Sequence, residues 1–251
     1  LLVSRQATFR AAHEAALRAI GSTDPGTIDI DRLKRVVQDR TGIPVDVCII
    51  GPDRIVQRTT YPPDQGLNFN EPALLDARNM IDRARDQSAI VVGAPVLEVM
   101  ARDFRVYTYS PLGESGHILQ FGFVPATINH HFQELEKALA QRSLFRANLY
   151  VMMRDNTLLS LQPERLIGQD KQSVIEASQR QKAGLIDGFH RARELQQPVP
   201  VNGTGSRRYA LQLMDLPYGD MNVMAVIEMH DDAVATTRLG LMTATGITFA
   251  L

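Results

Sequence analysis

The clearest hydrophobic pattern in the chain lies at residues 45–69. A short apolar run at 45–50 is followed by the turn sequence Gly-Pro-Asp at 51–53 and by a second run, rich in β-branched residues, at 55–60. Two apolar runs joined by turn residues predict a β-hairpin. Residues 61–69 contain two prolines and a glycine without a helical period, so we expect them to leave the sheet as an ordered crossing loop.

Helical periodicity appears in several other segments. The apolar positions Phe9, Ala12, Ala16 and Ile20 share one face of a helix that should end near Gly21. A second helix can be capped by Asp29 or Asp31, whose side chains suit an N-terminus. On these patterns the predicted helices cover residues 1–20, 31–40, 71–85, 126–146 and 171–185.

A second hairpin is predicted from strands at residues 104–112 and 117–124, and the pattern of both hairpins then starts again. The first hairpin is echoed by strands at 148–153 and 157–161, and the second by strands at 209–214 and 221–229. The offsets are similar, 103 residues from 45 to 148 and 105 residues from 104 to 209. Two structural copies of one unit explain this spacing. A further strand is predicted at 89–92 and a loop at 196–205.

These elements together predict an α+β fold in which a long N-terminal helix carries two copies of one unit. Each unit is expected to be an antiparallel sheet with flanking helices. The expected divisions are an N-terminal helical spine at 1–41, a first unit at 42–126, a connecting helix at 127–146, a second unit at 147–231 and a C-terminal segment at 232–251.

Composition narrows the class of protein. A chain of 251 residues that is 44% hydrophobic can bury a sizeable core. Its formal net charge of −1 gives no global attraction to nucleic acid. The single cysteine, Cys48, lies in the first apolar strand and cannot form an internal disulfide, so we interpret it as a small buried hydrophobe.

Both ends of the chain allow two interpretations. Residues 239–251 carry no charge but are fewer than the roughly 20 needed to span a bilayer. They are either a buried terminal helix or strand, or the beginning of a transmembrane helix, with residues 1–3 as the end of an earlier one. No secretory signal peptide is recognised in the sequence.

Enzymatic motifs are weak. The sequence Gly-Glu-Ser-Gly-His at 113–117 approaches a nucleophile elbow, but it lies between two strands, so we interpret it as a hairpin turn. His130 and His131 are adjacent on a predicted helix, and their side chains diverge too far to share a metal. There is no glycine-rich phosphate loop and no pair of cysteine ligands. We therefore expect no catalytic residue, no metal and no cofactor in this chain.

The best candidates for ligand binding are Arg105, Tyr107 and Tyr109. Alternate residues of one strand share a face, so a guanidinium and two phenols would project together toward a small anionic or aromatic ligand. Tyr61 and Asp64 in the crossing loop could close over the same space. The alternatives are an outward face with two half-buried tyrosines, and a loop that is merely packed and capped.

The order of these elements, with Thr-Thr-Tyr at 59–61 and Asp-x-Gly-Leu-x-Phe at 64–69, resembles the membrane-distal half of a double Cache domain. This family comprises tandem PAS-like extracytoplasmic sensors of bacterial histidine kinases, diguanylate cyclases and chemoreceptors. The chain departs from the members that bind amino acids, because it has no tryptophan, has Pro-Val-Leu-Glu at 95–98 in place of Pro-Tyr-x-Asp, and has no acid in the strand at 117–124.

The resemblance implies a non-catalytic, periplasmic ligand-sensing region of an inner-membrane receptor, with a site in the first unit. We expect a small organic acid as the ligand. We also expect a homodimer formed along the stripe Phe9, Ala12, Ala16 and Ile20, and attachment to the membrane through flanking helices. The alternative is a soluble enzyme or a cytosolic PAS-like regulatory domain.

Overall fold

The computed structural model describes nine stretches of the chain. They are residues 2–21, 23–140, 146–152, 157–161, 170–181, 183–197, 199–202, 208–214 and 222–229. The predicted C-terminal segment at 232–251 lies outside the described residues, so its alternatives stay open. Within the described part, no helix combines the length and the apolar character needed to cross a bilayer.

The described strands form two five-stranded sheets, in which neighbouring strands are antiparallel. The first sheet has the order β2-β1-β5-β4-β3 and the second has the order β7-β6-β10-β9-β8. The strands of the first are β1 Val45–Ile50, β2 Val56–Thr59, β3 Val91–Leu97, β4 Phe104–Pro111 and β5 Ile118–Phe123. Those of the second are β6 Arg146–Met152, β7 Leu158–Ser160, β8 Val199–Asn202, β9 Arg208–Met214 and β10 Asn222–Met229.

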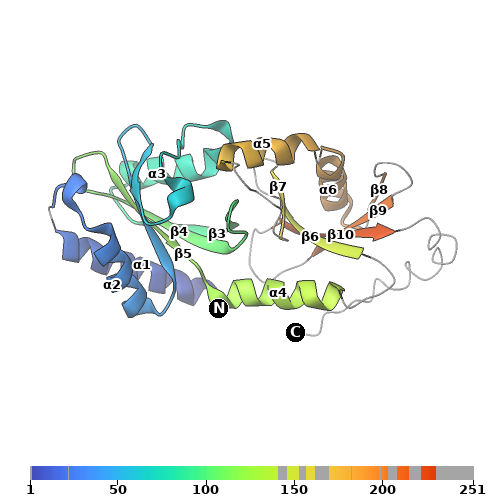
Figure 1. The fold of residues 1–251 in the computed structure, drawn as a ribbon, viewed down its shortest axis with the longest axis horizontal. Coiled ribbons are helices and arrows are strands. Elements are labelled where there is room, and N and C mark those ends of the chain that lie inside the picture. The colour runs from blue at the N-terminus through green and yellow to red at the C-terminus, as the bar shows by residue number, and fades with distance from the viewer. Residues whose placement is uncertain are drawn as a thin grey trace.

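The helices lie on both sides of these sheets. In Figure 1, α1, α2 and α4 run along one side of the molecule and α3, α5 and α6 along the other. Their bounds are α1 Leu2–Ile20, α2 Ile30–Thr41, α3 Leu75–Asp86, α4 Ala126–Ala140, α5 Lys171–Gln181 and α6 Ala183–Leu195. The predicted α+β architecture with antiparallel sheets is therefore confirmed, and the two sheets share one strand order.

Local sequence explains where the second helix begins and ends. Asp29 caps α2 by accepting a hydrogen bond from the backbone N–H of Arg32. The helix ends at Gly42, which takes the left-handed conformation with φ 65° and donates to the carbonyl of Gln38. Of the two predicted caps, Asp29 is the one used.

The first sheet separates two apolar clusters because its side chains alternate between faces. On β1, Val45, Val47 and Ile49 join the cluster that also contains α1 and α2, whereas Cys48 and Ile50 join the cluster beneath α3. All five of these side chains are buried. The predicted hairpin is confirmed, and its strand β1 is central in the core.

The crossing loop covers the outer side of β2. The backbone N–H of Val56 donates to Leu67, that of Gly66 donates back to Val56, and that of Phe69 donates to Arg54. The loop contains a 3-10 turn, Pro62–Asp64, before it pairs in this way. The prediction of an ordered crossing loop is therefore confirmed.

Several predicted boundaries were wrong. The helix predicted to reach residue 146 ends at Ala140, and Arg146 already belongs to strand β6. The strand predicted at 89–92 continues as β3 to Leu97, although Pro95 lies within it. The loop predicted at 196–205 contains the short strand β8, and the helical stretch predicted at 171–185 is the start of two successive helices.

The N-terminal helix does not carry both sheets. The described apolar side chains of α1 pack on the first sheet, whereas α4 supplies Ile128, Phe132 and Leu135 to the cluster that includes the second sheet. The predicted dimer stripe is also wrong, because Ala12 and Ala16 are 2% and 1% exposed inside the chain's own core. They pack there with Phe9, so a second chain cannot reach them.

The two sheets meet through a shared apolar cluster. Leu97, Val99 and Phe104 from the first sheet and its β3–β4 turn contact apolar residues of α4, α5 and the second sheet. Phe104 stacks on Phe132 of α4, with ring centroids 4.3 Å apart. Asn129 on the same helix accepts a hydrogen bond of 2.7 Å from the backbone N–H of Phe104. The end of β3 and the beginning of β4 therefore lie at the junction of the two sheets.

Candidate functional site

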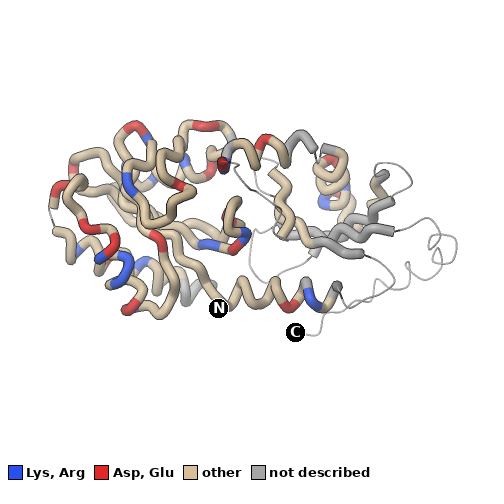
Figure 2. Tube along the Cα trace, in the orientation of Figure 1, with Lys and Arg blue, Asp and Glu red and all other residues tan. Residues whose placement is uncertain are grey.

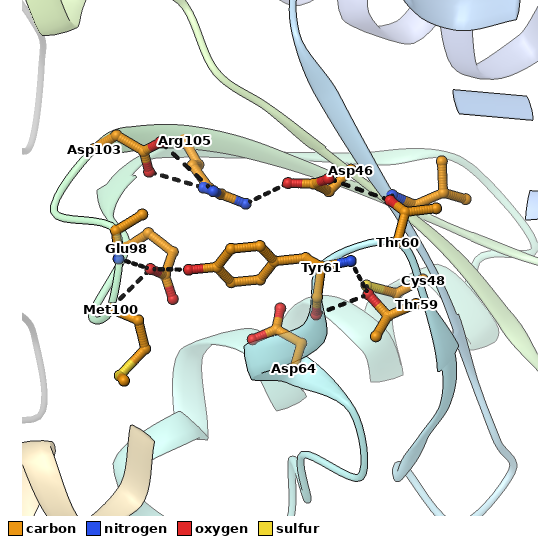
Figure 3. Close-up of polar contacts among 12 residues, drawn as sticks. Asp46, Cys48, Thr59, Thr60, Tyr61, Asp64, Glu98, Met100, Asp103 and Arg105 are labelled. Carbon is orange, nitrogen blue, oxygen red and sulfur yellow. Dashed lines mark hydrogen bonds and ion pairs between the residues drawn. The ribbon is translucent and has the colours of Figure 1, made fainter. Parts of the chain in front are cut away.

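Charged side chains gather at this junction, next to the turn between β3 and β4. Figure 2 shows acidic and basic positions side by side near that turn, and Figure 3 shows how Arg105, Tyr61, Glu98 and Asp46 point toward one another. The crossing loop, the β3–β4 turn, the strands β1 and β4 and the helix α5 each contribute to this cluster, which we call the junction cluster. Its members are Asp46, Tyr61, Asp64, Glu98, Asp103, Arg105 and Lys171.

Arg105 lies at the centre of the junction cluster and is 4% exposed. Its Nη1 donates to Asp46 Oδ2 at 2.9 Å and its Nε donates to Asp103 Oδ1 at 2.8 Å. A second bond to Asp103, from Nη2 to Oδ2, is longer at 3.5 Å. Asp46 is also bonded by Lys34 Nζ at 2.8 Å and by the hydroxyl of Thr60 at 3.2 Å. A buried guanidinium is thus held by two carboxylates.

Tyr61 is the aromatic centre of the cluster. The guanidinium carbon of Arg105 lies 4.2 Å from the centroid of its ring, and Lys171 Nζ lies 5.8 Å from it. Its hydroxyl donates to Glu98 Oε2 at 2.8 Å, and its backbone N–H donates to the hydroxyl of Thr59 at 2.9 Å. The end of β2 therefore fixes the ring between two cations and one carboxylate.

Glu98 organises the turn that joins β3 to β4. Its Oε2 accepts hydrogen bonds from the backbone N–H groups of Met100 at 2.7 Å and Ala101 at 2.5 Å, as well as from Tyr61. The backbone N–H of Glu98 donates to the carbonyl of Asp103 at 2.8 Å. One compact turn therefore fixes both the position of the Glu98 carboxylate and the position of Asp103.

Lys171 reaches the cluster from the second unit. It is the first residue of α5, and Asp170 caps that helix by accepting bonds of 2.9 and 2.7 Å from the backbone N–H and the hydroxyl of Ser173. Its Nζ contacts Asp64 Oδ1 and lies 2.7 Å from Glu98 Oε1. The Lys171 side chain is 8% exposed, so this bridge between the units is buried.

Burial and the neighbouring charges determine the pKa directions in the cluster. Burial alone would lower the pKa of Lys171, but Asp64 and Glu98 raise it, and the ammonium stays charged. Burial would raise the pKa of Glu98, but Lys171 and the hydrogen bond from Ala101 hold it below its usual value. Burial and the charge of Glu98 raise the pKa of Asp64 in spite of Lys171. Two carboxylates thus share one ammonium, and Glu98 is the better stabilised anion.

Burial and neighbouring charges also determine the pKa directions of the tyrosines and of Arg105. Burial and the charge of Glu98 raise the pKa of Tyr61, and burial raises the pKa values of Tyr107 and Tyr109. Burial alone would lower the pKa of Arg105, but its hydrogen bond to Asp103 and nearby acids raise it. All three phenols are therefore neutral hydrogen-bonding groups at neutral pH, and Arg105 is a permanent cation.

The structure brings together three of the five predicted site residues. Arg105, Tyr61 and Asp64 all belong to the junction cluster. Tyr107 and Tyr109 share the face of β4 that carries Arg105, as predicted, and their ring centroids are 6.5 Å apart. Tyr109 is buried in the apolar cluster beneath α3, where Tyr107 also packs. Tyr107 is still close enough for Asp64 and Glu98 to affect its pKa, whereas Tyr109 is mainly a core residue.

Sequence reasoning missed several members of the cluster. They include Asp46 and Lys171, which carry no motif and lie far from Arg105 along the chain, and Glu98, which lies only seven residues before it. The signal that could have identified Glu98 is its position in the Pro-Val-Leu-Glu sequence at 95–98. This acid comes just before the strand that carries Arg105, so it was a candidate partner of the predicted guanidinium. Nothing in the sequence pointed to Lys171.

Two other side chains that often carry chemistry, His13 and Cys48, lie outside the junction cluster. No group of three or more His, Cys, Asp or Glu side chains in the described residues is placed to hold a metal ion. His13 contacts Ser110 at 2.6 Å and Thr108 at 2.7 Å, but all three are buried within the core and outside the cluster. Cys48 is also buried, and burial raises its pKa to about 12, so its thiol is inert.

Comparison with known proteins gave only distant structural matches. No family model and no curated protein matches this sequence. Among solved structures, the isoleucine-bound sensory domain of the Campylobacter jejuni chemoreceptor Tlp3 is 10% identical, with 93% of this chain and 88% of that chain covered and a TM-score of 0.36. The L-serine-bound ligand-binding domain of the Pseudomonas fluorescens chemoreceptor CtaA is 15% identical, with coverages of 92% and 89% and a TM-score of 0.38.

A partial match involves a protein of another kind. The Bacillus subtilis YkuI protein, which has an EAL domain, is 13% identical over 47% of this chain and 31% of that chain, with a TM-score of 0.36. Because all three TM-scores are low, the function of this chain is argued below from its own contacts.

Proposed function

We propose that this chain is a ligand-sensing domain built from two PAS-like units of the double Cache type, and that its first unit binds a small molecule at the junction cluster. The proposed divisions are those expected from the sequence, with a first unit at 42–126 and a second at 147–231. The connecting helix predicted at 127–146 is shorter than expected, because α4 ends at Ala140.

The observation that carries this proposal is the burial of the junction cluster. Arg105, Glu98 and Lys171 are each at most 8% exposed, although charged side chains are rarely buried without a partner. Buried ion pairs often contribute less than well-packed apolar residues would, so they are weak evidence for stability. Groups with strongly perturbed pKa values around one aromatic ring are instead typical of functional sites.

A small organic acid remains our proposed ligand. Each of the three cations Lys34, Arg105 and Lys171 already pairs with at least one of the carboxylates Asp46, Asp64, Glu98 and Asp103. A ligand must therefore replace one internal partner. Asp103 is the more solvent-accessible partner of Arg105, since its side chain is 28% exposed against 14% for Asp46, and its second bond is 3.5 Å long. A ligand carboxylate that arrives from solvent would take its place and keep the charge-assisted bonds of the guanidinium.

The membrane context is also a proposal. We infer that the domain is the periplasmic part of an inner-membrane receptor whose output module is a kinase, a cyclase or a chemotaxis module. A homodimer belongs to the same proposal, but its interface would have to avoid the buried stripe on α1. The alternative, a soluble enzyme or cytosolic regulatory domain, is distinguished by the gene: hydrophobic segments of about 20 residues on both sides of this region support the receptor.

Calorimetric titration of the domain with acetate, lactate, succinate and citrate tests the binding proposal. We expect at least one acid to bind and Arg105→Lys to weaken it by about 10- to 150-fold, which corresponds to one lost charge-assisted hydrogen bond of about 1.5 to 3 kcal/mol. Arg18→Lys is the matched control, because the Arg18 side chain is 69% exposed on α1. Binding that survives Arg105→Lys unchanged would remove the site from the junction cluster.

Arg105→Ala is a harsher test than the sequence alone suggested. We predicted that this change would abolish binding without unfolding the domain. The structure shows that it also leaves Asp46 and Asp103 without their shared cation, so its fold must be checked by circular dichroism before binding is interpreted.

A further inference from the structure

Lys171 joins the two units at the proposed ligand site. Asp64 comes from the crossing loop, Glu98 from the β3–β4 turn, and Lys171 from α5, which packs against β7 and α6 of the second unit. The other contacts described across the junction are apolar or involve α4. The ammonium of Lys171 is thus a buried charged contact that ties α5 to the ligand site.

We propose that Lys171 is a clamp that holds the second unit against the first, and that ligand binding at Arg105 releases it. This inference rests on the proposed function, because it names how the same site would be regulated. A ligand can shift a conformational equilibrium only if it binds one arrangement better than the other, so the site must be connected to an element that can move.

The connection runs through the β3–β4 turn. Asp103 bonds Arg105 with its side chain and accepts the backbone N–H of Glu98 with its carbonyl at 2.8 Å. Glu98 in turn pairs with Lys171. A ligand carboxylate that displaces Asp103 from Arg105 therefore acts on the residue that positions the carboxylate of Glu98, and through it on α5.

Opening the clamp takes the ammonium of Lys171 away from Glu98 Oε1, which then needs water, but it leaves the bonds of Glu98 Oε2 in place. Glu98 keeps three hydrogen bonds that do not depend on Lys171, from Tyr61, Met100 and Ala101. Asp64 is the less stabilised anion of the pair and depends on Lys171 for its charged contact. The long side chain of Lys171 can reach solvent as α5 moves away, and the turn remains folded around Glu98.

The distance between the two units tests the clamp. Spin labels are placed on cysteines introduced at Val36 and Leu195, which are 45% and 51% exposed on α2 and α6. The background carries Cys48→Ser, which removes the only native thiol and keeps a hydroxyl near Thr59. The double variant Asp64→Asn, Lys171→Met then removes one charge of each sign, so the net charge is unchanged.

We expect one narrow distance distribution by pulsed electron resonance in the unaltered background and a broader or shifted one in the double variant. The matched control is Glu134→Gln, Lys137→Met, which removes an exposed pair on α4 and should leave the distribution unchanged. A double variant that folds and keeps the narrow distribution would overturn the clamp. If the double variant does not fold, Lys171→Arg is measured in its place. Because this change keeps the charge, Lys171→Arg must retain the narrow distance distribution, and succinate must broaden that distribution.

Titration with succinate separates the clamp from the binding proposal. If the clamp opposes binding, the double variant should bind succinate at least about five-fold more tightly, because no clamp has to be released. Succinate should also broaden the distribution of the unaltered domain. Binding of equal strength in both proteins, with no change in distance, would overturn the coupling and leave the site intact. If neither the unaltered domain nor the double variant binds succinate, but the double variant has a broadened distance distribution, the proposed ligand is overturned and the clamp is supported.

Discussion

The hydroxyl of Tyr61 donates to Glu98 Oε2 at 2.8 Å, and this bond joins the crossing loop to the β3–β4 turn. Tyr61→Phe keeps the ring beneath Arg105 and removes only this bond. We expect it to lower the free energy of unfolding by about 1.5 kcal/mol, as is typical for a hydrogen bond to a charged acceptor. Chemical denaturation of Tyr61→Phe, Glu98→Gln and the double variant measures the coupling. Strictly additive effects would show that the bond contributes nothing.

His13 should make the domain sensitive to acid. It is fully buried, and burial together with the charge of Arg10 lowers its pKa to about 3. Below pH 6.5 the unfolded chain binds a proton at this residue and the folded chain does not, so stability is lost as the pH falls from 6.5 toward 3. A shift of this size corresponds to at most about 5 kcal/mol.

Denaturation measured between pH 7 and pH 4 checks this prediction. His13→Gln can still bond Thr108 and Ser110 but does not titrate, so its stability should fall less over this range. His130→Gln, at an exposed position on α4, is the control and should follow the unaltered protein. Equal slopes for all three proteins would contradict a buried neutral His13.

Substitution on α1 should destabilise the fold rather than separate two chains. Ala12→Glu places a carboxylate in the core beside Phe9, where it has no room and no described cation. We expect a loss of more than about 3 kcal/mol, as for an unpaired buried charge. Ala11→Glu on the exposed side of the same helix is the control and should be nearly neutral. The melting temperature distinguishes the two outcomes, and a stable Ala12→Glu that no longer self-associates would restore the dimer stripe.

Gly122 on β5 provides a test of the position of Tyr107. A Cβ atom added at residue 122 would lie 2.9 Å from Tyr107 Cε1, which is too close for two carbon atoms. Gly122→Ala should therefore push the ring away and cost about 1 to 3 kcal/mol, as for other overpacked sites. Gly184→Ala in α6 is the control, because a Cβ there meets nothing within 4 Å. The free energy of unfolding and the near-ultraviolet tyrosine signal measure both effects.

The elements that could be predicted are those in which local pattern and tertiary packing agree. The hairpin at 45–60 alternates between two buried clusters, so its period of two is visible in the sequence. The strand β8 and the second half of β3 were missed because prolines interrupt them. Pro200 and Pro95 lie on edge strands of their sheets, where a missing N–H is tolerated.

The candidate site could be predicted only in part. Arg105, Tyr107 and Tyr109 were identified because strand alternation places them on one face. The partners of Arg105 depend on tertiary contacts, since Asp46 lies on β1 and Asp103 in a turn. Lys171 lies in the other unit, 107 residues from Asp64, and no local pattern reports such a contact. The dimer stripe was misassigned for a related reason: small apolar residues on a helix do not reveal which surface covers them.

The crossing loop that pairs with the outer side of β2 also limits how chains can associate. An open strand edge offers a row of unpaired N–H and C=O groups that can template a strand from another molecule. In the first sheet, residues 66–69 already use groups of Val56 and Arg54 along one edge, and Pro95 interrupts the row of donors along the other. This sheet should therefore resist growing into edge-to-edge fibrils, and any pairing of two chains through it would have to use side chains.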